Sequence, residues 1–189
     1  AVGTALAGID LRGHDVRAIA VDGTSGTILA IETDGAPASL ASMYNDVAEA
    51  ADLAMVAAVA SRDTAALGAT SPLARALAMR GQGSRIIHQA DWIVGCLSGR
   101  FDVTDENNAL KTGYDPATRT WPEWIAGTGL DPVLLPRVVP AGERIGTILP
   151  AMADRFGLPH DVAIVAGTTD GCAAFLASGA SEPGDGVTS

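Results

Sequence analysis

Lysine and cysteine are nearly absent from the 189-residue sequence. Lys111 is the only lysine, and the formal net charge is −10. A chain this negative repels phosphate backbones and anionic lipid surfaces, so neither nucleic acid nor a membrane is expected as a partner. The two cysteines, Cys96 and Cys172, lie far apart and form no C-x-x-C pair. Neither a disulfide framework nor a zinc site is indicated.

The sequence also lacks a membrane-spanning run, a signal peptide and the common phosphate-binding motifs. The apolar run ADLAMVAAVA is short and contains Asp52, and the first residues, AVGTALAG, carry no positive charge. We therefore expect a cytoplasmic protein with free, buried thiols. Neither the P-loop pattern G-x-x-x-x-G-K-S/T nor the dinucleotide pattern G-x-G-x-x-G occurs.

Apolar residues, by contrast, make up 48% of the chain, which is long enough for one domain with a buried core. The residue patterns predict a β-hairpin of residues 16–21 and 27–33, helices over 45–60, 72–80 and 84–99, a loop-rich stretch over 100–150, a strand over 162–166 and a helix over 171–178. In the last two elements, a buried strand runs through a tight turn into a helix. This order predicts an α/β fold.

The loop of residues 23–27, GTSGT, supports three hypotheses: a serine nucleophile's turn, a phosphate-binding loop or the wall of a substrate pocket. A nucleophile elbow needs G-x-S-x-G between a strand and a helix, but Thr27 replaces the second glycine and a strand-like run follows Ser25. Possible general bases for a serine hydrolase are His14, His88 and His160. A phosphate loop lacks support because no lysine and no helix N-terminus are near. The residues alone therefore give little support to a nucleophile or a phosphate loop, and they do not by themselves establish a pocket wall.

Asp170, in AGTTDG, follows the predicted buried strand and precedes a helix. It therefore lies at the carboxyl end of a strand, where α/β proteins place ligands. Helix amides and the hydroxyl of Thr168 or Thr169 would keep the carboxylate ionised, which suits a base that accepts a hydroxyl proton during phosphoryl transfer. The alternative is a helix N-cap aspartate, which is the commoner role and the one favoured by the residues alone.

Four stretches occur together in one order along the chain: VRAIAVDGTSGTILAIETDGAP with MYND, HQADWIVGCLSGRFDVTDENNALKTGYDP, LLPRVVPAGERIGTI and VAIVAGTTDGCAAFLASGASEPGDGVTS. With them the sequence resembles the FGGY carbohydrate kinases, in the branch similar to D-ribulose and D-xylulose kinases. The resemblance implies a ribonuclease H-like, actin-type α/β domain. It also implies ATP- and Mg²⁺-dependent transfer of the γ-phosphate to a hydroxyl of a pentulose-like sugar.

The resemblance also assigns roles to residues. Asp170 matches the general base, and no residue of this chain is assigned to a metal. The positions implied to contact the sugar are Ser25, Gly26, Tyr44, Asn45 and, in a loop, Asn108; those implied to contact the nucleotide are Thr168 and Thr169. The implied partners are a small-molecule sugar and, as one option, a second copy in a homodimer.

The sequence departs from the family pattern at two places. Ala48 stands where the family usually has arginine, and GIDLRG, residues 8–13, only superficially resembles the family's D-x-G-T phosphate motif. We therefore expect residues 1–15 to end a connecting helix and form a loop. Residues 1–189 would then form the N-terminal sugar-binding domain, with the first strand segment and the C-terminal nucleotide-binding domain absent. The alternative function is a truncated, non-catalytic sugar-binding remnant of such a kinase.

Overall fold

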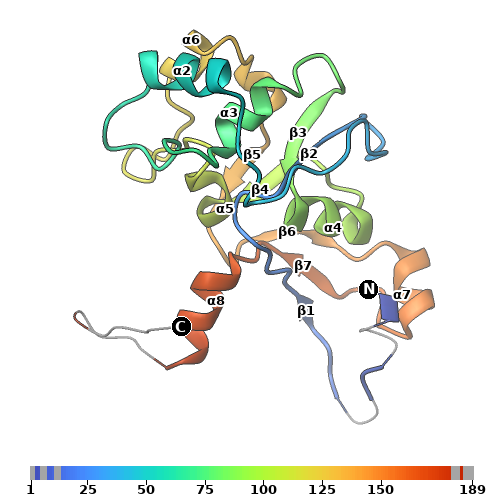
Figure 1. Ribbon diagram of the computed structural model, residues 1–189. Helices are drawn as coiled ribbons and strands as arrows, with labels where there is room; N and C mark the ends of the chain where they lie inside the picture. The colour runs from blue at the N-terminus through green and yellow to red at the C-terminus, as the bar shows by residue number, and fades with distance from the viewer. Residues whose placement is uncertain (1–2, 5–7, 11–13, 180–183, 185–189) are drawn as a thin grey trace.

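The computed structural model describes residues 3–4, 8–10, 14–179 and 184 (Figure 1). Its strands are β1 (Ala18–Ile19), β2 (Ile28–Ile31), β3 (Arg85–His88), β4 (Val103–Asp105), β5 (Arg137–Val139), β6 (Arg144–Thr147) and β7 (Ala163–Val165). Its helices are α2 (Ala50–Val59), α3 (Pro72–Leu77), α4 (Gln89–Ser98), α5 (Glu106–Leu110), α6 (Trp124–Gly127), the 3₁₀ turn η1 (Pro132–Leu134), α7 (Pro150–Phe156) and α8 (Asp170–Ala177). The α/β class expected from the sequence is confirmed.

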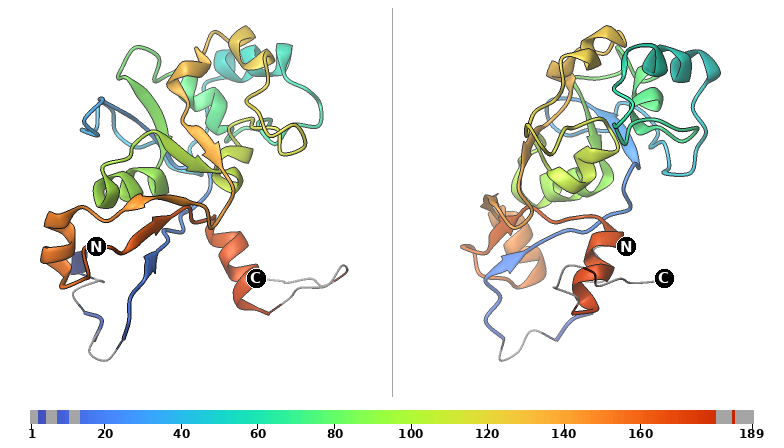
Figure 2. Two further views of the ribbon diagram at one scale, coloured as in Figure 1. Left: turned by 180° about the vertical axis from the view of Figure 1, so that it is seen from behind. Right: turned by 90° about the vertical axis from the view of Figure 1, so that its left-hand side faces the viewer.

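The strands of the described chain form three small sheets. β1 pairs in parallel with β7, and β7 pairs antiparallel with β6. β2 pairs antiparallel with β3, and β4 pairs in parallel with β5. The β1–β7–β6 sheet and α7 lie at one end of the molecule, while α2, α3 and α6 gather at the other (Figures 1 and 2). Helix α8 lies at the same end as this sheet, beside β1 and β7.

The predicted β-hairpin is wrong. β1 and β2 form in the expected places, but β1 pairs with β7 and β2 pairs with β3, so the loop between them joins two sheets. All four residues of β2 are buried, and its edge away from β3 is bridged by residues 37 and 42. A run of β-branched residues predicts a strand but does not specify its partner, because pairing depends on distant segments.

The helix predicted over residues 84–99 is wrong in its first part. Residues 85–88, RIIH, form β3, and α4 begins only at Gln89. The side chain of Asp91 accepts a hydrogen bond from the His88 amide (3.0 Å), which gives the helix its start. The expected end is confirmed, because Gly99 has the left-handed conformation with φ 76°.

The two preceding helices are shorter than predicted. Helix α3 starts at Pro72 as expected, with the Ser71 hydroxyl accepting from the Ala74 amide (3.1 Å), but it ends at Leu77. Helix α2 starts at Ala50 rather than residue 45, because residues 43–46 form a separate turn. That turn carries two of the predicted sugar contacts, so its geometry bears on the site.

Two apolar clusters form most of the core. One lies among α2, α3, α6 and the β2–β3 pair, and Trp121 and Trp124 pack against it. The Trp121 indole N–H also donates to the carbonyl oxygen of Pro136 (2.9 Å). The other lies among α4, α7 and the β1–β7–β6 sheet. Residues 100–150, expected to be loop-rich, contribute three strands and several short helices to this frame.

Three further expectations concern residues 1–15, the two cysteines and membrane-spanning helices. Gly3 and Thr4 lie in a helical turn, and the rest of the connecting helix and loop predicted over residues 1–15 falls partly on residues 1–2, 5–7 and 11–13, which are outside the described ones. Cys96 and Cys172 are free, but both are half-buried rather than buried. In the described ranges no helix has the length and apolar character needed to cross a membrane.

Candidate active site

The loop after β1 and the turn after β7 lie side by side. The Gly23 amide donates to the carbonyl oxygen of Thr168 (3.2 Å), and the Asp170 amide donates to the carbonyl oxygen of Gly23 (3.0 Å). The Asp22 carboxylate accepts from the Thr168 amide (3.1 Å). These bonds continue the parallel β1–β7 pairing beyond both strands. We call residues 22–27 the Ser25 loop and residues 167–171 the Asp170 turn.

A glycine allows this close approach. A Cβ added to Gly167 would lie 2.1 Å from the carbonyl oxygen of Val21, a separation that no side chain tolerates. On the other strand, a Cβ on Gly23 would lie 3.0 Å from the Cβ of Ala90 in α4. The two segments therefore meet backbone to backbone.

Asp170 is the first residue of α8, and its carboxylate is exposed. The helix N-cap is Thr169, whose hydroxyl accepts from the Cys172 amide (3.3 Å), so the N-cap interpretation of Asp170 is wrong. One carboxylate oxygen of Asp170 accepts from the Thr24 hydroxyl (3.0 Å) and the other from the Gly171 amide (2.8 Å). The carboxylate is thus held by Thr24 and a helix amide, and not by the hydroxyls of Thr168 and Thr169 as expected.

Ser25 follows Thr24 in a tight turn that runs on toward β2. No helix follows this serine, so the strand–turn–helix elbow of a serine hydrolase is absent here. Among the hydrogen bonds of the described residues, none joins a histidine to Ser25. The geometry therefore does not favour the hydrolase hypothesis.

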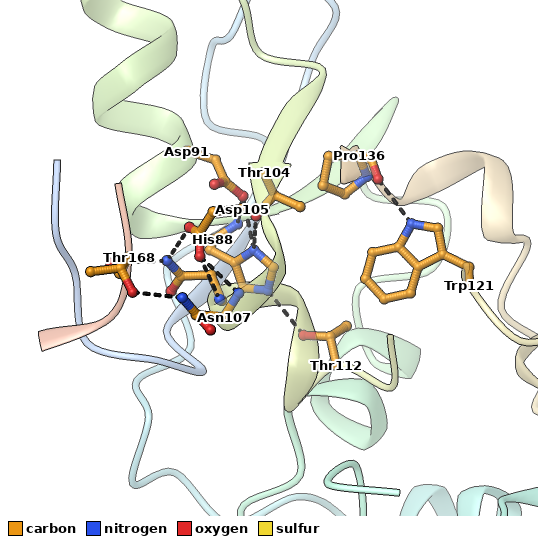
Figure 3. Close-up of polar contacts among 10 residues, drawn as sticks. His88, Asp91, Thr104, Asp105, Asn107, Thr112, Trp121, Pro136 and Thr168 are labelled. Atoms are coloured by element: carbon orange, nitrogen blue, oxygen red, sulfur yellow. Dashed lines mark hydrogen bonds and ion pairs between the residues drawn. The ribbon is translucent and has the colours of Figure 1, made fainter. Parts of the chain in front are cut away.

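His88, one of the three histidines considered as a general base, is buried in a polar network of its own (Figure 3). Its Nδ1 lies 2.8 Å from the Asp91 carboxylate and 3.0 Å from the Thr104 hydroxyl, and its Nε2 lies 3.0 Å from the Thr112 hydroxyl. Both ring nitrogens are therefore engaged. The network joins β3, α4, β4 and the segment after α5.

The start of α5 contacts the Asp170 turn from the other side (Figure 3). The Asn107 amide group donates to the Thr168 hydroxyl (2.8 Å). The Asn108 amide group donates to the Asp105 carboxylate (2.6 Å) and to the Thr168 carbonyl oxygen (3.3 Å). Asp105 in turn accepts from the backbone amides of both asparagines and so caps α5. Sequence reasoning missed Asn107, whose role appears only through its contact with Thr168.

Burial affects two side chains in this contact, the carboxyl group of Asp105 and the amide group of Asn108. Desolvation raises the pKa of Asp105, an effect that its hydrogen bonds from Asn108 and the neighbouring His88 partly offset. Asn108 lies on α5 and not in a loop, and it is fully buried, with its side-chain oxygen unpartnered. A fully buried side chain cannot present an amide to a ligand without movement of its neighbours. In this structure Asn108 supports the Asp170 turn.

Tyr44 and Asn45 lie on residues 43–46, which we call the Tyr44 turn, and both are exposed. The Tyr44 amide donates to the Thr27 hydroxyl (3.2 Å), so this turn contacts the Ser25 loop. Ala48, where the resemblance leads one to expect arginine, is buried. The structure therefore brings the segments of Ser25, Gly26 and Tyr44 together on the side of the Ser25 loop away from β1.

A cavity of about 720 Å³ opens beside the Asp170 turn. The residues that give it polar character and backbone access are Asp22, Asn107, Gly142, Thr168, Gly171 and Cys172. Small and apolar residues just after β1, before β6, at the end of β7 and along α8 form the remaining wall. The cavity joins an open, mostly apolar surface to the polar turn that carries the predicted base.

Comparison with known proteins identifies the family. Residues 74–177, more than half of the chain, match the family model described as "FGGY family of carbohydrate kinases, N-terminal domain". This chain belongs to the FGGY family of carbohydrate kinases. Asn108, Thr168, Thr169 and Asp170 lie inside the matched FGGY segment, whereas the Ser25 loop and the Tyr44 turn precede it.

Curated FGGY relatives carry the names of pentulose kinases. A ribulokinase of Halalkalibacterium halodurans is 31% identical over 111 residues, which cover 53% of this chain and 19% of that protein. A xylulose kinase of Streptomyces rubiginosus is 39% identical over 103 residues, covering 52% of this chain and 20% of that protein. The segments that match therefore span about a fifth of the length of these FGGY relatives.

Solved FGGY structures confirm the fold. The xylulose kinase from Rhodospirillum rubrum superimposes with a TM-score of 0.76 at 22% identity, covering 87% of this chain and 38% of that one. A ligand-bound xylulose kinase from Lactobacillus acidophilus gives a TM-score of 0.75 at 18% identity, with 95% and 39% covered. The ribonuclease H-like, actin-type fold expected from the sequence is thus the fold of this FGGY chain.

Proposed function

We propose that residues 1–189 form the N-terminal, sugar-binding domain of a cytoplasmic kinase that transfers the γ-phosphate of ATP to a hydroxyl of a pentulose. The observation that carries this proposal is the exposed Asp170 carboxylate, oriented by Thr24 and Gly171 at the carboxyl end of β7. The names of the two curated relatives, a ribulokinase and a xylulose kinase, favour a pentulose as the sugar.

Asp170 acts in this proposal as the general base. The sugar hydroxyl oxygen attacks the γ-phosphorus of ATP, its proton passes to the Asp170 carboxylate, and the bond from phosphorus to ADP breaks. Proton transfer of this kind needs a carboxylate held in one orientation within hydrogen-bonding distance of the hydroxyl. The Thr24 hydroxyl and the Gly171 amide each donate to one oxygen of the Asp170 carboxylate and hold it in one orientation.

The sugar is oriented by the Ser25 loop and the Tyr44 turn. Ser25 and Asn45 offer hydrogen-bonding side chains, and Tyr44 offers an exposed ring. Gly26 is buried, and a Cβ there would face Pro72 and Arg75, so it contributes through the conformation of the loop. Fixing the hydroxyl against both base and phosphate lowers the barrier because fewer orientations are lost in the transition state. Asn108 takes part through its contact with Thr168, as the burial of its side chain requires.

The residues beside the 720 Å³ cavity fit a nucleotide's phosphates. Gly171 lets the backbone come close, and the hydroxyls of Thr168 and Thr169, which accept hydrogen bonds here, each retain a proton to donate. Mg²⁺ is commonly held by one or two carboxylates together with substrate phosphates, and Asp22 provides an exposed carboxylate at the cavity for that purpose. Bound Mg²⁺ would neutralise phosphate charge that repels this acidic chain.

Replacing Asp170 with asparagine tests the proposal. In the protein at its full natural length, Asp170→Asn should lower the rate of ADP formation with D-ribulose or D-xylulose by roughly 10²–10⁴, the usual contribution of a positioned base. The matched control is Asp161→Asn, the same change at an exposed aspartate ahead of β7, at its opposite end. The control should retain the wild-type rate. Near-normal turnover in Asp170→Asn would rule out the assignment.

Titration calorimetry separates catalysis from mere sugar binding. A wild-type protein that binds a pentulose but neither binds ATP–Mg²⁺ nor forms ADP would be a non-catalytic sugar-binding protein instead of a kinase. Light scattering of the same samples would show whether a homodimer forms.

A further inference from the structure

Arg75 is a buried cation that the proposed reaction does not use. It lies in the last turn of α3 with 5% of its surface exposed, and every other residue of that helix is apolar. Among the ion pairs of the described residues, none includes Arg75. An arginine buried in this way bears a large desolvation cost, so its contacts must serve a purpose that an apolar side chain could not.

Its guanidinium donates to three different loops. Nη2 donates to the carbonyl oxygen of Gly26 (2.5 Å) and to that of Thr70 (3.2 Å), and Nη1 donates to the Ser42 hydroxyl (2.8 Å). Gly26 belongs to the Ser25 loop, Ser42 immediately precedes the Tyr44 turn, and Thr70 ends the segment before α3. A planar guanidinium can bind several acceptors at fixed angles, which the ammonium of lysine cannot do.

The contact with Ser42 continues into the Tyr44 turn. The Ser42 hydroxyl donates to the Asp46 carboxylate (3.3 Å), and the same carboxylate oxygen accepts from the Met43 amide (2.7 Å). One chain of hydrogen bonds therefore runs from Arg75 through Ser42 to Asp46. Tyr44 and Asn45 lie between the two ends of the turn that this chain closes.

The buried state of Arg75 agrees with a role in orientation rather than in stability. Desolvation lowers the pKa of Arg75, and the nearby charge of Asp46 opposes that effect. Its Nε is buried without a hydrogen-bond partner. A buried cation with an unpaired donor contributes less to stability than a well-packed apolar side chain would, since its desolvation is only partly compensated.

We propose that Arg75 is a positioning residue for the sugar subsite: it fixes the Ser25 loop relative to the Tyr44 turn without touching the sugar. The inference rests on the proposed function, because it assumes that these two segments orient the sugar. It does not involve the Asp170 carboxylate, which is held independently by Thr24 and Gly171. Arg75 should therefore influence the binding of the sugar more than the chemical step.

Steady-state kinetics of Arg75→Met in the full-length protein provide the test. At saturating ATP, the KM for the pentulose should rise by roughly tenfold to a hundredfold, the equivalent of one lost charge-assisted hydrogen bond. The KM for ATP and the value of kcat should stay close to wild type. Hydrogen exchange at the amides of residues 42–46 should become faster. Arg75→Lys, which keeps the charge but not the planar fork, should recover only part of the affinity.

Arg80→Met is the matched control. Arg80 follows α3 and donates to the carbonyl oxygens of Leu77 (2.7 Å) and Gly129 (3.5 Å), and it pairs with Asp52 (3.9 Å). None of these partners belongs to the Ser25 loop or the Tyr44 turn. Its replacement should leave the KM for the sugar unchanged. A similar rise in KM for Arg80→Met and Arg75→Met would overturn the proposal, because it would show a general effect of removing an arginine.

Ser42→Ala keeps the test valid if Arg75→Met fails to fold. It removes one acceptor of the guanidinium and the link to Asp46, and it should raise the KM for the sugar by roughly threefold to tenfold, less than Arg75→Met does because the guanidinium still donates to Gly26 and Thr70. An unchanged KM in both Ser42→Ala and Arg75→Lys would overturn the role of Arg75. A wild-type protein that phosphorylates no pentulose would instead refute the proposed function, which separates the two failures.

Discussion

The Ser25 loop is held in two different ways along its length. Its first half, residues 22–24, pairs with the Asp170 turn through two backbone hydrogen bonds of Gly23, to which the side chains of Asp22 and Thr24 add one each, and Gly167 lies against Val21. Its second half, residues 25–27, makes contacts that depend on side chains: the Arg75 guanidinium donates to the carbonyl oxygen of Gly26, and the loop's own Thr27 hydroxyl accepts from the Tyr44 amide. One short loop therefore combines a backbone-determined part with a side-chain-determined part.

This difference matches the tasks proposed for the two halves. Proton transfer to Asp170 tolerates little displacement, and backbone pairing is insensitive to most side-chain changes. Recognition of a particular sugar, by contrast, has to differ among related kinases. Side-chain contacts such as those of Arg75 and Thr27 can be changed one at a time, so the second half can be altered without disturbing the first.

The largest effect should come from breaking the backbone-determined half. Gly167→Ala would place a Cβ 2.1 Å from the Val21 carbonyl oxygen, so the two segments would have to separate. We expect the free energy of unfolding to fall by about 3 kcal/mol or more, at the upper end of overpacking effects, and turnover to be lost. Urea denaturation followed by circular dichroism measures this change.

Gly171→Ala is the control for that substitution. A Cβ at Gly171 would have no neighbour within 4 Å, and the residue lies in the first turn of α8. Alanine should therefore stabilise the protein by about 0.5–1 kcal/mol through its better helix propensity. Equal stabilities of the two variants would contradict the close approach of Gly167 to Val21.

A pair of threonine substitutions in the same loop should separate the two halves kinetically. Thr24→Val removes the hydroxyl that orients Asp170, so kcat should fall by roughly tenfold while the KM for the sugar changes little. Thr27→Val removes the acceptor of the Tyr44 amide, so the KM should rise several-fold while kcat changes little. Steady-state assays with D-ribulose and D-xylulose give both constants.

Thr33→Val provides the baseline for this pair, since Thr33 is an exposed residue just beyond β2. It should match wild type in both constants. If Thr24→Val and Thr27→Val changed kcat and KM in the same proportion, the two halves of the Ser25 loop would not have the separate roles proposed for them.

The smallest effect concerns pH and the support of the Asp170 turn by α5. Burial raises the pKa of Asp105 above its ordinary value of 3.8, so the folded state binds a proton there more readily than the unfolded state does. As pH falls through that raised pKa toward 3.8, wild type should therefore gain stability relative to Asp105→Asn; as pH rises above it, this gain is lost. Urea midpoints measured from neutral pH downward check the sign, and a constant difference between the two proteins would contradict it.

The part of the site around Asp170 could be predicted from local sequence. A buried apolar run, two threonines, an aspartate and a small-residue helix specify the strand, turn and helix by short-range rules, and β7 and α8 begin within a residue or so of the predicted places. The role of Asp170 as a general base came from the resemblance, because local rules alone predict that Asp170 is the N-cap of the helix.

The partners of that site could not be predicted in the same way. RIIH reads equally well as the start of the helix that follows it, and only pairing with β2 makes it a strand. Thr24 contacts Asp170, which lies 146 positions further along the chain. Asn107 contacts Thr168, which lies 61 positions further along. Arg75 did leave a signal: it is the only charged residue in the apolar helix PLARAL.

The contact between Gly167 and Val21 also limits how the molecule can move. If β1 slid along β7 by one residue, a side chain would have to occupy a space that admits only a hydrogen atom. The register of the two strands is therefore locked, and with it the spacing between Thr24 and Asp170. Any closure around a substrate therefore has to move Thr24 and Asp170 together. Such a motion can bring the sugar to the Asp170 carboxylate without breaking its hydrogen bond with Thr24.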